Sequence, residues 1–205
     1  MNLQVNEIFA SIQGEGYWTG LPCVFLRLQG CNLDPPCAWC DTPQAQGWST
    51  TKTHNVMDVM DIVNSFKPCT VVVTGGEPMM QSDALKELIR LDMGSHRWHL
   101  ETNGTIKIPN MFQWVTISPK YGQNPPVIVA AYADELKFVI AYLSDISSMP
   151  ILNQNDYPYL KRVWLQPVSN DPEMIKMCVD WLLSIPSSEQ LFGLSVQVHK
   201  LIGVK

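Results

Sequence analysis

The segment CTVVVTGGEP, from Cys69 to Pro78, joins an unbroken run of β-branched residues directly to two glycines. A run of this kind, in which apolar and polar residues do not alternate, is typical of a strand that is buried on both faces in a parallel sheet. The segment therefore predicts a central strand at 69–74 that ends in a glycine-rich turn.

Further strands and helices are expected to alternate on both sides of this segment. The helix expected at 55–66 has apolar residues at i, i+3, i+4 and i+7 from Val56, which gives one apolar face, and Asn55 can cap it. The other expected helices are 82–91 and 171–185. The expected strands are 23–29, 69–74, 98–101, 115–118, 135–140, 162–166 and 194–198, with loops at 30–50 and 123–126. This alternation predicts an α/β fold with a mostly parallel sheet, in one domain that spans residues 1–205.

Polar motifs follow several of the expected strands. They are QGCN at 29–32, TGGEP at 74–78, ETNG at 101–104, SPK at 118–120 and LQP at 165–167. In parallel sheets the ligand site lies at the carboxyl ends of the strands. The five motifs are far apart in the sequence, yet they are expected to line one cleft.

Composition narrows the class of protein. With 14 Lys and Arg against 19 Asp and Glu, the formal net charge is −5, which argues against binding to a nucleic-acid backbone. No apolar run is long enough for a membrane span, and the N-terminal residues MNLQVNEIF lack the pattern of a secretory signal. We expect a globular cytoplasmic protein, whose thiols stay reduced.

Three of the six cysteines, Cys31, Cys37 and Cys40, lie close together in a C-x5-C-x2-C pattern, which indicates metal or redox chemistry. Three thiolates can hold a [4Fe–4S] cluster and leave its fourth iron open to another ligand. Cys23 lies eight residues earlier across an expected strand, about 26 Å away, which is too far for a fourth ligand. Cys23, Cys69 and Cys178 are expected to be small buried hydrophobes.

The cysteine spacing by itself leaves three other interpretations open. A structural zinc site needs four ligands, and His54 is the available fourth. A thioredoxin-like C-x-x-C pair has no place for the third cysteine. The third interpretation is a set of free thiols with a purely structural role. The cysteine spacing does not distinguish among these interpretations, whereas motifs elsewhere in the chain do.

The cysteine loop after a first strand, GGEP after a second and ETNG after a third resemble together the radical S-adenosylmethionine (SAM) superfamily. A narrower resemblance, from about residue 3 to the end, is to the 7-carboxy-7-deazaguanine synthase family. It rests on the motifs NEIF at 6–9, SIQGEG at 11–16, TG at 19–20, FLR at 25–27, CDT at 40–42, SPK at 118–120 and QVHK at 197–200. The chain departs from the usual C-x3-C-x2-C pattern of the family by two residues, at Pro35 and Pro36, which are expected to bulge outward.

The resemblance implies an incomplete TIM-like (β/α) barrel of the radical SAM type. It implies a lyase that converts 6-carboxy-5,6,7,8-tetrahydropterin to 7-carboxy-7-deazaguanine with loss of ammonia, in 7-deazapurine biosynthesis such as that of queuosine. The implied cofactors are a [4Fe–4S] cluster, SAM and Mg²⁺. The implied partners are a reducing electron donor such as flavodoxin and a second copy of the chain.

The resemblance also implies roles for residues of this sequence. Cys31, Cys37 and Cys40 would bind the cluster, and Thr42 would bind Mg²⁺. SAM would be bound by Trp39, Cys40, Asp41, Gly76, Glu77, Ser118, Pro119, Lys120 and Gln166. The pterin would be bound by Ile12, Gln13, Gly14, Glu15, Arg27, Thr74, His199 and Lys205, the last through its carboxylate. A carboxylate suits the N–H donors of a guanidine-like edge, and an arginine suits a carboxylate, which the pterin has.

Each of these residues also has a plainer interpretation. Trp39 can be core packing, the glycines an ordinary turn, Arg27 a paired structural charge, and residues 41–42 a turn that closes the loop. The end of the chain, with His199 expected in the last strand, can be frayed. Two rival functions remain open, a glycyl-radical activase and a non-enzymatic iron–sulfur or zinc module.

Overall fold

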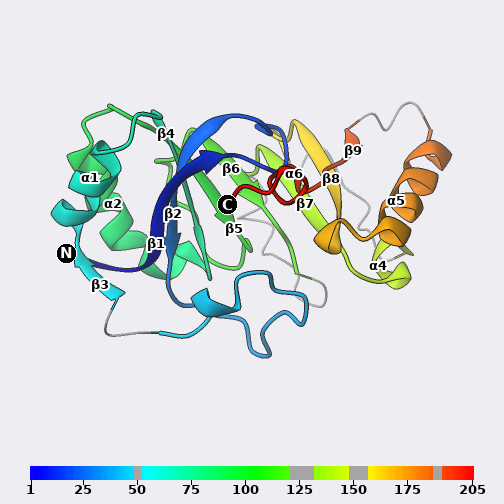
Figure 1. Ribbon diagram of the computed structural model, residues 1–205, viewed down its shortest axis with the longest axis horizontal. Helices are drawn as coiled ribbons and strands as arrows, with labels where there is room; N and C mark the ends of the chain where they lie inside the picture. The colour runs from blue at the N-terminus through cyan, green and yellow to red at the C-terminus, as the bar shows by residue number, and fades with distance from the viewer. Residues whose placement is uncertain (49–51, 121–131, 148–156, 187–190) are drawn as a thin grey trace.

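The computed structural model describes residues 1–48, 52–120, 132–147, 157–186 and 191–205. Within these residues, nine strands form one sheet in the order β3-β1-β2-β4-β5-β6-β7-β8-β9 (Figure 1). The strands are β1 Asn2–Ile12, β2 Pro22–Leu28, β3 Thr53–Asn55, β4 Thr70–Gly75, β5 Arg97–Thr102, β6 Trp114–Ile117, β7 Glu135–Ile140, β8 Arg162–Pro167 and β9 Phe192–Leu194. The α-helices are α1 Val56–Asn64, α2 Ser82–Leu91, α4 Leu143–Ser147, α5 Pro172–Ser184 and α6 Val198–Ile202.

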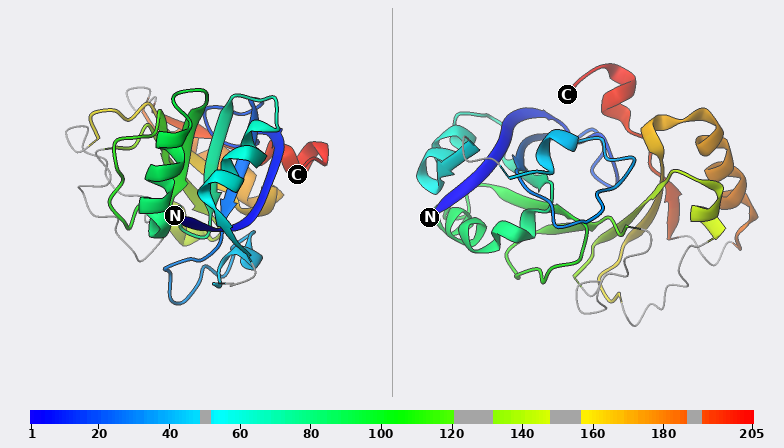
Figure 2. Two further views of the ribbon diagram at one scale, coloured as in Figure 1. Left: turned by 90° about the vertical axis from the view of Figure 1, so that its left-hand side faces the viewer. Right: turned by 90° about the horizontal axis from the view of Figure 1, so that it is seen from below.

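The sheet is parallel from β2 through β9, whereas β1 runs antiparallel to β2 and to β3. It curls into an open, incomplete barrel, with α1 and α2 at one end and α4 and α5 at the other (Figures 1 and 2). The expected α/β fold with a mostly parallel, partial barrel is thus confirmed. Among the described residues, none of the helices has the length and hydropathy needed to span a bilayer.

Local chemistry sets the ends of the helices where the sequence predicts them. The Asn55 side chain caps α1 by accepting a hydrogen bond from the Met57 N–H at 2.9 Å. The Asp171 carboxylate caps α5 by accepting from the N–H groups of Glu173 and Met174. Each cap satisfies N–H groups that the first turn of a helix leaves without an intrahelical partner.

The prediction of a last strand at 194–198 is wrong. The edge strand β9 covers only Phe192–Leu194, and residues from Val198 onward form helix α6. The reason lies in Asn170, whose side chain accepts from the Gln197 N–H at 2.7 Å and donates to the Gln197 carbonyl at 2.9 Å. Because both backbone groups of Gln197 are taken, this residue cannot continue a ladder with β8.

Strand β1 is absent from the strands that the sequence predicts, because most of its side chains are only partly buried and do not alternate strictly. One expectation about the cysteines is also wrong. Cys69 is exposed, because it precedes the first buried residue of β4, Thr70. Cys23 and Cys178 are buried as expected, and burial raises the pKa of their thiols to about 12 and about 11. The loop expected at 123–126 lies outside the described residues.

The core lies between the sheet and the helices that cover its outer face. Its side chains are almost all aliphatic, and several on the central strands are fully buried, among them Leu26, Leu28, Val73, Leu100 and Leu136. This core holds the carboxyl ends of the parallel strands in register, where the polar motifs follow.

Leu100→Ala in β5 is expected to lower the free energy of unfolding by about 2–5 kcal/mol, because it leaves a cavity in the core. Urea unfolding followed by circular dichroism measures the change. Met57→Ala on α1 is the control, since Met57 is 53% exposed and lies away from α5, and it should cost less than about 0.5 kcal/mol. Equal losses in the two variants would contradict the placement of Leu100 in the core.

Candidate functional site

One cleft of about 220 Å³ opens at the carboxyl ends of the parallel strands. All five polar motifs contribute to its lining, as the parallel arrangement predicts. The contributing residues are Cys31 from QGCN, Thr74, Gly75 and Gly76 from TGGEP, Glu101, Thr102 and Asn103 from ETNG, Ser118 and Lys120 from SPK, and Gln166 from LQP. Residues that are up to 135 positions apart in the sequence therefore share one cavity.

Cys31, Cys37 and Cys40 all line this cleft and are half-buried. The inserted residues Pro35 and Pro36 are exposed, and Pro36 also contributes to the edge of the cleft that the three cysteines line. Burial raises the pKa of Cys37; Cys40 and Cys31 raise it further, whereas Lys120 opposes the shift.

The base of the cysteine loop is held by backbone and amide hydrogen bonds. The Cys31 N–H donates to the Gln46 carbonyl at 2.8 Å. Asn32 accepts from Asn103 at 2.9 Å and donates to Thr105 at 2.8 Å, which joins the loop to the end of β5. The loop is therefore held in place at Cys31 and Asn32, and its later residues Cys37 and Cys40 line the cleft.

A closed zinc site finds no support in this geometry. Among the described residues, no three His, Cys, Asp or Glu side chains form a group that could hold a single metal ion. His54, the available fourth zinc ligand, pairs with Leu3 in β3 and does not line the cleft.

The two glycines after β4 are required by the backbone beside them. A Cβ atom on Gly75, whose φ is +138°, would lie 2.2 Å from the Leu28 carbonyl oxygen. A Cβ on Gly76 would lie 2.0 Å from the Gly30 carbonyl oxygen. The glycines thus let the end of β4 pack directly on the end of β2, and the same approach leaves both of them facing the cleft.

Glu77 is fully buried and does not line the cleft. Its carboxylate accepts from the Met79 N–H at 2.9 Å, the Thr102 hydroxyl at 2.7 Å and the Asn103 N–H at 2.8 Å. Burial raises its pKa, and these three donors act against the shift. Of the other residues expected to bind SAM, Pro119 also lies outside the lining, whereas the remaining ones line it.

The floor of the cleft carries charged side chains. The Lys137 ammonium lies 2.5 Å from a Glu15 oxygen and 3.9 Å from a Glu101 oxygen. Burial would raise the pKa of Glu15, but Lys137 outweighs it, and with a hydrogen bond from Gln197 the pKa falls to about 2. Gln13 and Thr74 donate to the two Glu101 oxygens at 3.0 and 3.1 Å. At neutral pH the Glu15 carboxylate on this floor is ionised, and fixed donors hold both Glu15 and Glu101.

Arg27 lies at one side of the cleft. Its Nε donates to Glu7 at 2.9 Å, and the guanidinium lies 6.0 Å from the Phe9 ring centroid. Glu7 also pairs with the Lys205 ammonium, and the Ser11 hydroxyl donates to a backbone oxygen of Lys205 at 2.6 Å. Lys205 is therefore held beside Arg27 and lines the same cleft.

His199 lies in helix α6, not in a strand, and it still lines the cleft. It packs on Gly14, where a Cβ atom would come within 2.0 Å of the His199 Nδ1. Ile12, Gln13 and Gly14 line the cleft as well, so the structure brings together all the residues expected to bind the pterin.

The comparisons with known proteins agree with this geometry. No protein-family model matches the chain. The 7-carboxy-7-deazaguanine synthase of Bacteroides thetaiotaomicron is 36% identical over 206 residues, which covers all of both chains. That of Aquifex aeolicus is 34% identical and covers 99% of this chain and 94% of its own.

The chain belongs to the 7-carboxy-7-deazaguanine synthase family.

The crystal structure of QueE from Escherichia coli superposes with a TM-score of 0.77 at 26% identity, over 97% of this chain and 95% of that one. The chain is accordingly an enzyme, a radical SAM lyase. This excludes the non-enzymatic metal module and the glycyl-radical activase.

The cleft of this synthase contains residues that the sequence did not single out for a role. They are Glu101, Asn103, Thr116, Lys137, Gln197 and Lys200. A signal for one of them was present, because Lys137 is an ionisable residue between the apolar residues Leu136 and Phe138 of a strand. Such residues are rarely buried without a charged partner. Gln197 belongs to the QVHK motif at 197–200, but its contacts with Glu15 and Asp41 span more than 150 positions, so the sequence did not indicate them.

Glu77→Gln is expected to lower the free energy of unfolding by about 2 kcal/mol, because an amide NH₂ would face buried N–H and O–H donors. Urea unfolding measures the loss. Glu173→Gln on the exposed start of α5 is the control and should change the free energy by less than about 0.5 kcal/mol. If the two substitutions cost the same, the Glu77 carboxylate does not hold the turn.

Proposed function

We propose that the cleft converts 6-carboxy-5,6,7,8-tetrahydropterin to 7-carboxy-7-deazaguanine with loss of ammonia, as a step of 7-deazapurine biosynthesis such as that of queuosine. The observation that carries the proposal is that three thiols and the Glu15 and Arg27 side chains line a single cavity. A radical reaction needs its cofactor and substrate in contact and shielded from water.

Cys31, Cys37 and Cys40 are proposed to bind a [4Fe–4S] cluster. Three half-buried thiols that face one cleft suit a four-iron cluster, because each thiolate can take a different iron and one iron remains for SAM. When bound, the cluster and SAM supply the radical chemistry of the superfamily, and the protein supplies binding, orientation and exclusion of water.

SAM is proposed to lie against Trp39, Cys40, Asp41, Gly76, Ser118, Lys120 and Gln166. The support is strongest for the SPK turn, where the Lys120 ammonium donates to the Ser118 hydroxyl at 2.8 Å and lies 5.1 Å from the Trp39 ring centroid. An ammonium and a hydroxyl beside an aromatic face suit a ligand with a carboxylate, a ribose and an adenine. Glu77 is proposed to act indirectly, by holding Gly76 and Asn103 in place.

Glu15 and Arg27 are proposed to recognise the two ends of the pterin. The Glu15 carboxylate stays ionised, with a pKa of about 2, and ionised carboxylates accept hydrogen bonds from a guanidine-like edge. Only Nε of Arg27 is engaged by a described residue, so its Nη groups are available for the substrate carboxylate. Ile12, Gln13, Gly14, Thr74, His199 and the Lys205 carboxylate are proposed to complete the substrate site.

Thr42 is proposed to contact Mg²⁺. It precedes the short 3₁₀ helix η1 (Pro43–Ala45) but does not cap it with its side chain. Its hydroxyl lies 3.8 Å from the Cys40 sulfur and at the cleft. A hydroxyl that no turn engages can bind a hard cation together with oxygens of the substrate carboxylate.

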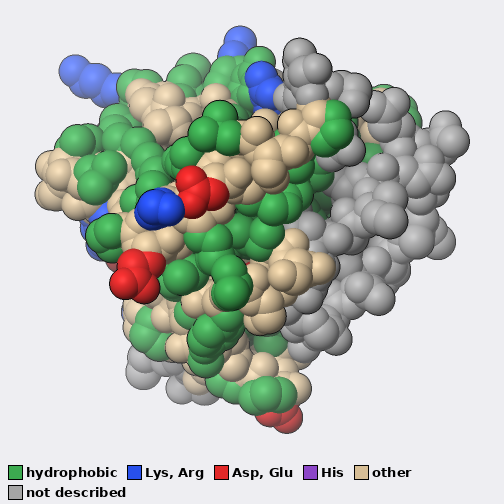
Figure 3. Space-filling model, turned by 90° about the vertical axis from the view of Figure 1, so that its right-hand side faces the viewer, with side chains coloured by type: hydrophobic (Ala, Val, Ile, Leu, Met, Phe, Trp, Pro, Cys, Tyr) green, Lys and Arg blue, Asp and Glu red, His purple; other side chains and the backbone are tan. Residues whose placement is uncertain are grey.

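We also propose a homodimer, a reducing protein such as flavodoxin as electron donor, and action in the cytoplasm. The surface over α4 and α5 supports the homodimer, because many hydrophobic side chains and few charged ones cover it (Figure 3). Tyr142, Leu143 and Leu183 on this side are exposed. Large exposed apolar surfaces mark sites of association.

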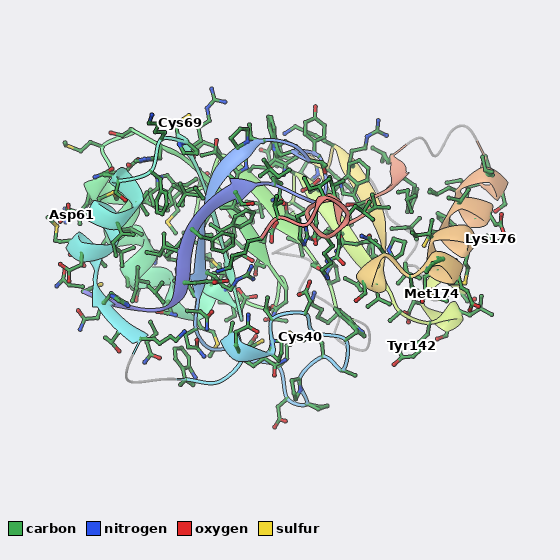
Figure 4. The ribbon with its side chains drawn as sticks, in the orientation of Figure 1. Cys40, Asp61, Cys69, Tyr142, Met174 and Lys176 are labelled. Atoms are coloured by element: carbon green, nitrogen blue, oxygen red, sulfur yellow. The ribbon has the colours of Figure 1, made fainter. Side chains whose placement is uncertain are left out.

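Anaerobic reconstitution with iron and sulfide, followed by reduction and addition of SAM, Mg²⁺ and the pterin, should yield 7-carboxy-7-deazaguanine by mass spectrometry. Cys40→Ala should abolish both the product and the brown colour of the cluster. Cys69→Ala should retain both, since Cys69 is exposed, does not line the cleft and lies on the opposite side of the molecule from Cys40 in Figure 4.

Two outcomes would contradict the proposal in different ways. A brown protein that cleaves SAM and leaves the pterin intact would refute the substrate. Failure of the wild type to take up iron and sulfide would refute the cluster ligands.

A further inference from the structure

Gln197 is a buried residue for which the proposed function has no role. It directly precedes α6 and is 3% exposed. Asn170 holds both of its backbone polar groups, so its Cα position is set by the turn after β8. From this position its side chain extends into the cleft.

The Gln197 side chain joins three distant segments. Its Nε2 donates to Glu15 Oε1 at 2.7 Å and to Asp41 Oδ2 at 3.1 Å. Its Oε1 accepts from the Lys200 Nζ at 2.8 Å, and the same ammonium lies 3.3 Å from Asp41 Oδ2. The pterin-binding segment, the end of the cysteine loop and helix α6 thus meet at one amide.

The partners determine which way this amide points. A lysine ammonium can only donate hydrogen bonds, and an ionised carboxylate can only accept them. The Gln197 oxygen must therefore face Lys200, and its NH₂ group must face Glu15 and Asp41. The reversed amide would place its oxygen against two carboxylates and its NH₂ group against the ammonium.

We propose that Gln197 is a positioning residue of the reaction, which couples the pterin-binding carboxylate of Glu15 to the cysteine loop through Asp41. This inference rests on the proposed function. Lys137 holds one oxygen of Glu15 and Gln197 holds the other, so the carboxylate has a single orientation. Asp41 directly follows Cys40, so the same amide sets the distance between the substrate and the cofactor loop.

Loss of this coupling is expected to disturb the alignment of the bound substrate with the cysteine loop more than it lowers the stability of the fold. A misplacement of about 1 Å costs on the order of 100-fold in rate when reacting groups must be aligned. A 5′-deoxyadenosyl radical that is no longer aligned with the substrate would take its hydrogen atom from the reductant in the assay, which would release 5′-deoxyadenosine without product. The ratio of 5′-deoxyadenosine to 7-carboxy-7-deazaguanine therefore reports the coupling directly.

The test compares Gln197→Met with Gln44→Met. Methionine keeps the length of glutamine and removes its hydrogen-bonding groups, and Gln44 is exposed with a side chain that contacts no described residue by a hydrogen bond. For Gln197→Met we expect the Kd for 7-carboxy-7-deazaguanine, measured by calorimetry without SAM, to rise about tenfold. We also expect the ratio of 5′-deoxyadenosine to product to rise severalfold. Gln44→Met should match the wild type in both.

Lys200→Met provides a second variant, because Lys200 is at the surface and its loss spares the core. Without the ammonium, the Gln197 oxygen loses its donor and Asp41 loses its ion pair, so the same two changes should appear at smaller size. If thermal unfolding shows that Gln197→Met does not fold, the Lys200→Met variant is compared with Gln44→Met in its place.

The outcomes separate this inference from the function on which it rests. A wild type that makes 7-carboxy-7-deazaguanine, with Gln197→Met and Lys200→Met equal to Gln44→Met in Kd and in the ratio, overturns the role of Gln197 alone. If both variants fold and bind the product normally but their ratio rises, Gln197 positions the cysteine loop without Glu15, which also overturns the coupling. A wild type that leaves the pterin intact overturns the proposed function as well.

Discussion

The buried carboxylate of Glu77 is the interaction on which the arrangement of the site depends. It lies after β4 and accepts hydrogen bonds from Thr102 and Asn103 at the end of β5. Asn103 then donates to Asn32 at the base of the cysteine loop. One carboxylate thus ties two strand ends together and, through one amide, orients the loop that carries the three thiols. An unpaired polar group in this position would lower the free energy of unfolding. Loss of one hydrogen bond to Glu77 is therefore expected to loosen the turn after β4.

The charges on the floor of the cleft follow a related constraint. Glu15 and Glu101 share the Lys137 ammonium, so two partly buried carboxylates are matched by one cation. Burial of charge is costly unless each group is paired and hydrogen-bonded. Gln13, Thr74 and Gln197 supply the remaining hydrogen bonds. The excess of acceptors suits a substrate edge that is rich in N–H groups, such as that of a pterin.

The parts of the fold that could be predicted are those in which local pattern and tertiary environment agree. The continuous β-branched run of β4 and the capped faces of α1 and α5 are of this kind. Two of the errors lie toward the two ends of the sheet. Strand β1 is half exposed and carries no clear period, and the predicted last strand ends early because Asn170 takes both backbone groups of Gln197. A side chain 27 positions away decided that change, and no local pattern records it.

The sequence by itself determined the parallel α/β framework, the motifs at the strand ends and the three cysteines with their exposed insertion, because these depend on local periodicity and on neighbouring residues. The residues of the site were largely predictable for the same reason. Only the tertiary structure decided how they are paired: Glu77 points into the protein, Lys137 holds Glu15, and Gln197 bridges Glu15 and Asp41. The physical reason is that a buried polar group takes whichever donor or acceptor the fold brings near it, and many of those partners lie 25 to 182 positions away in the chain.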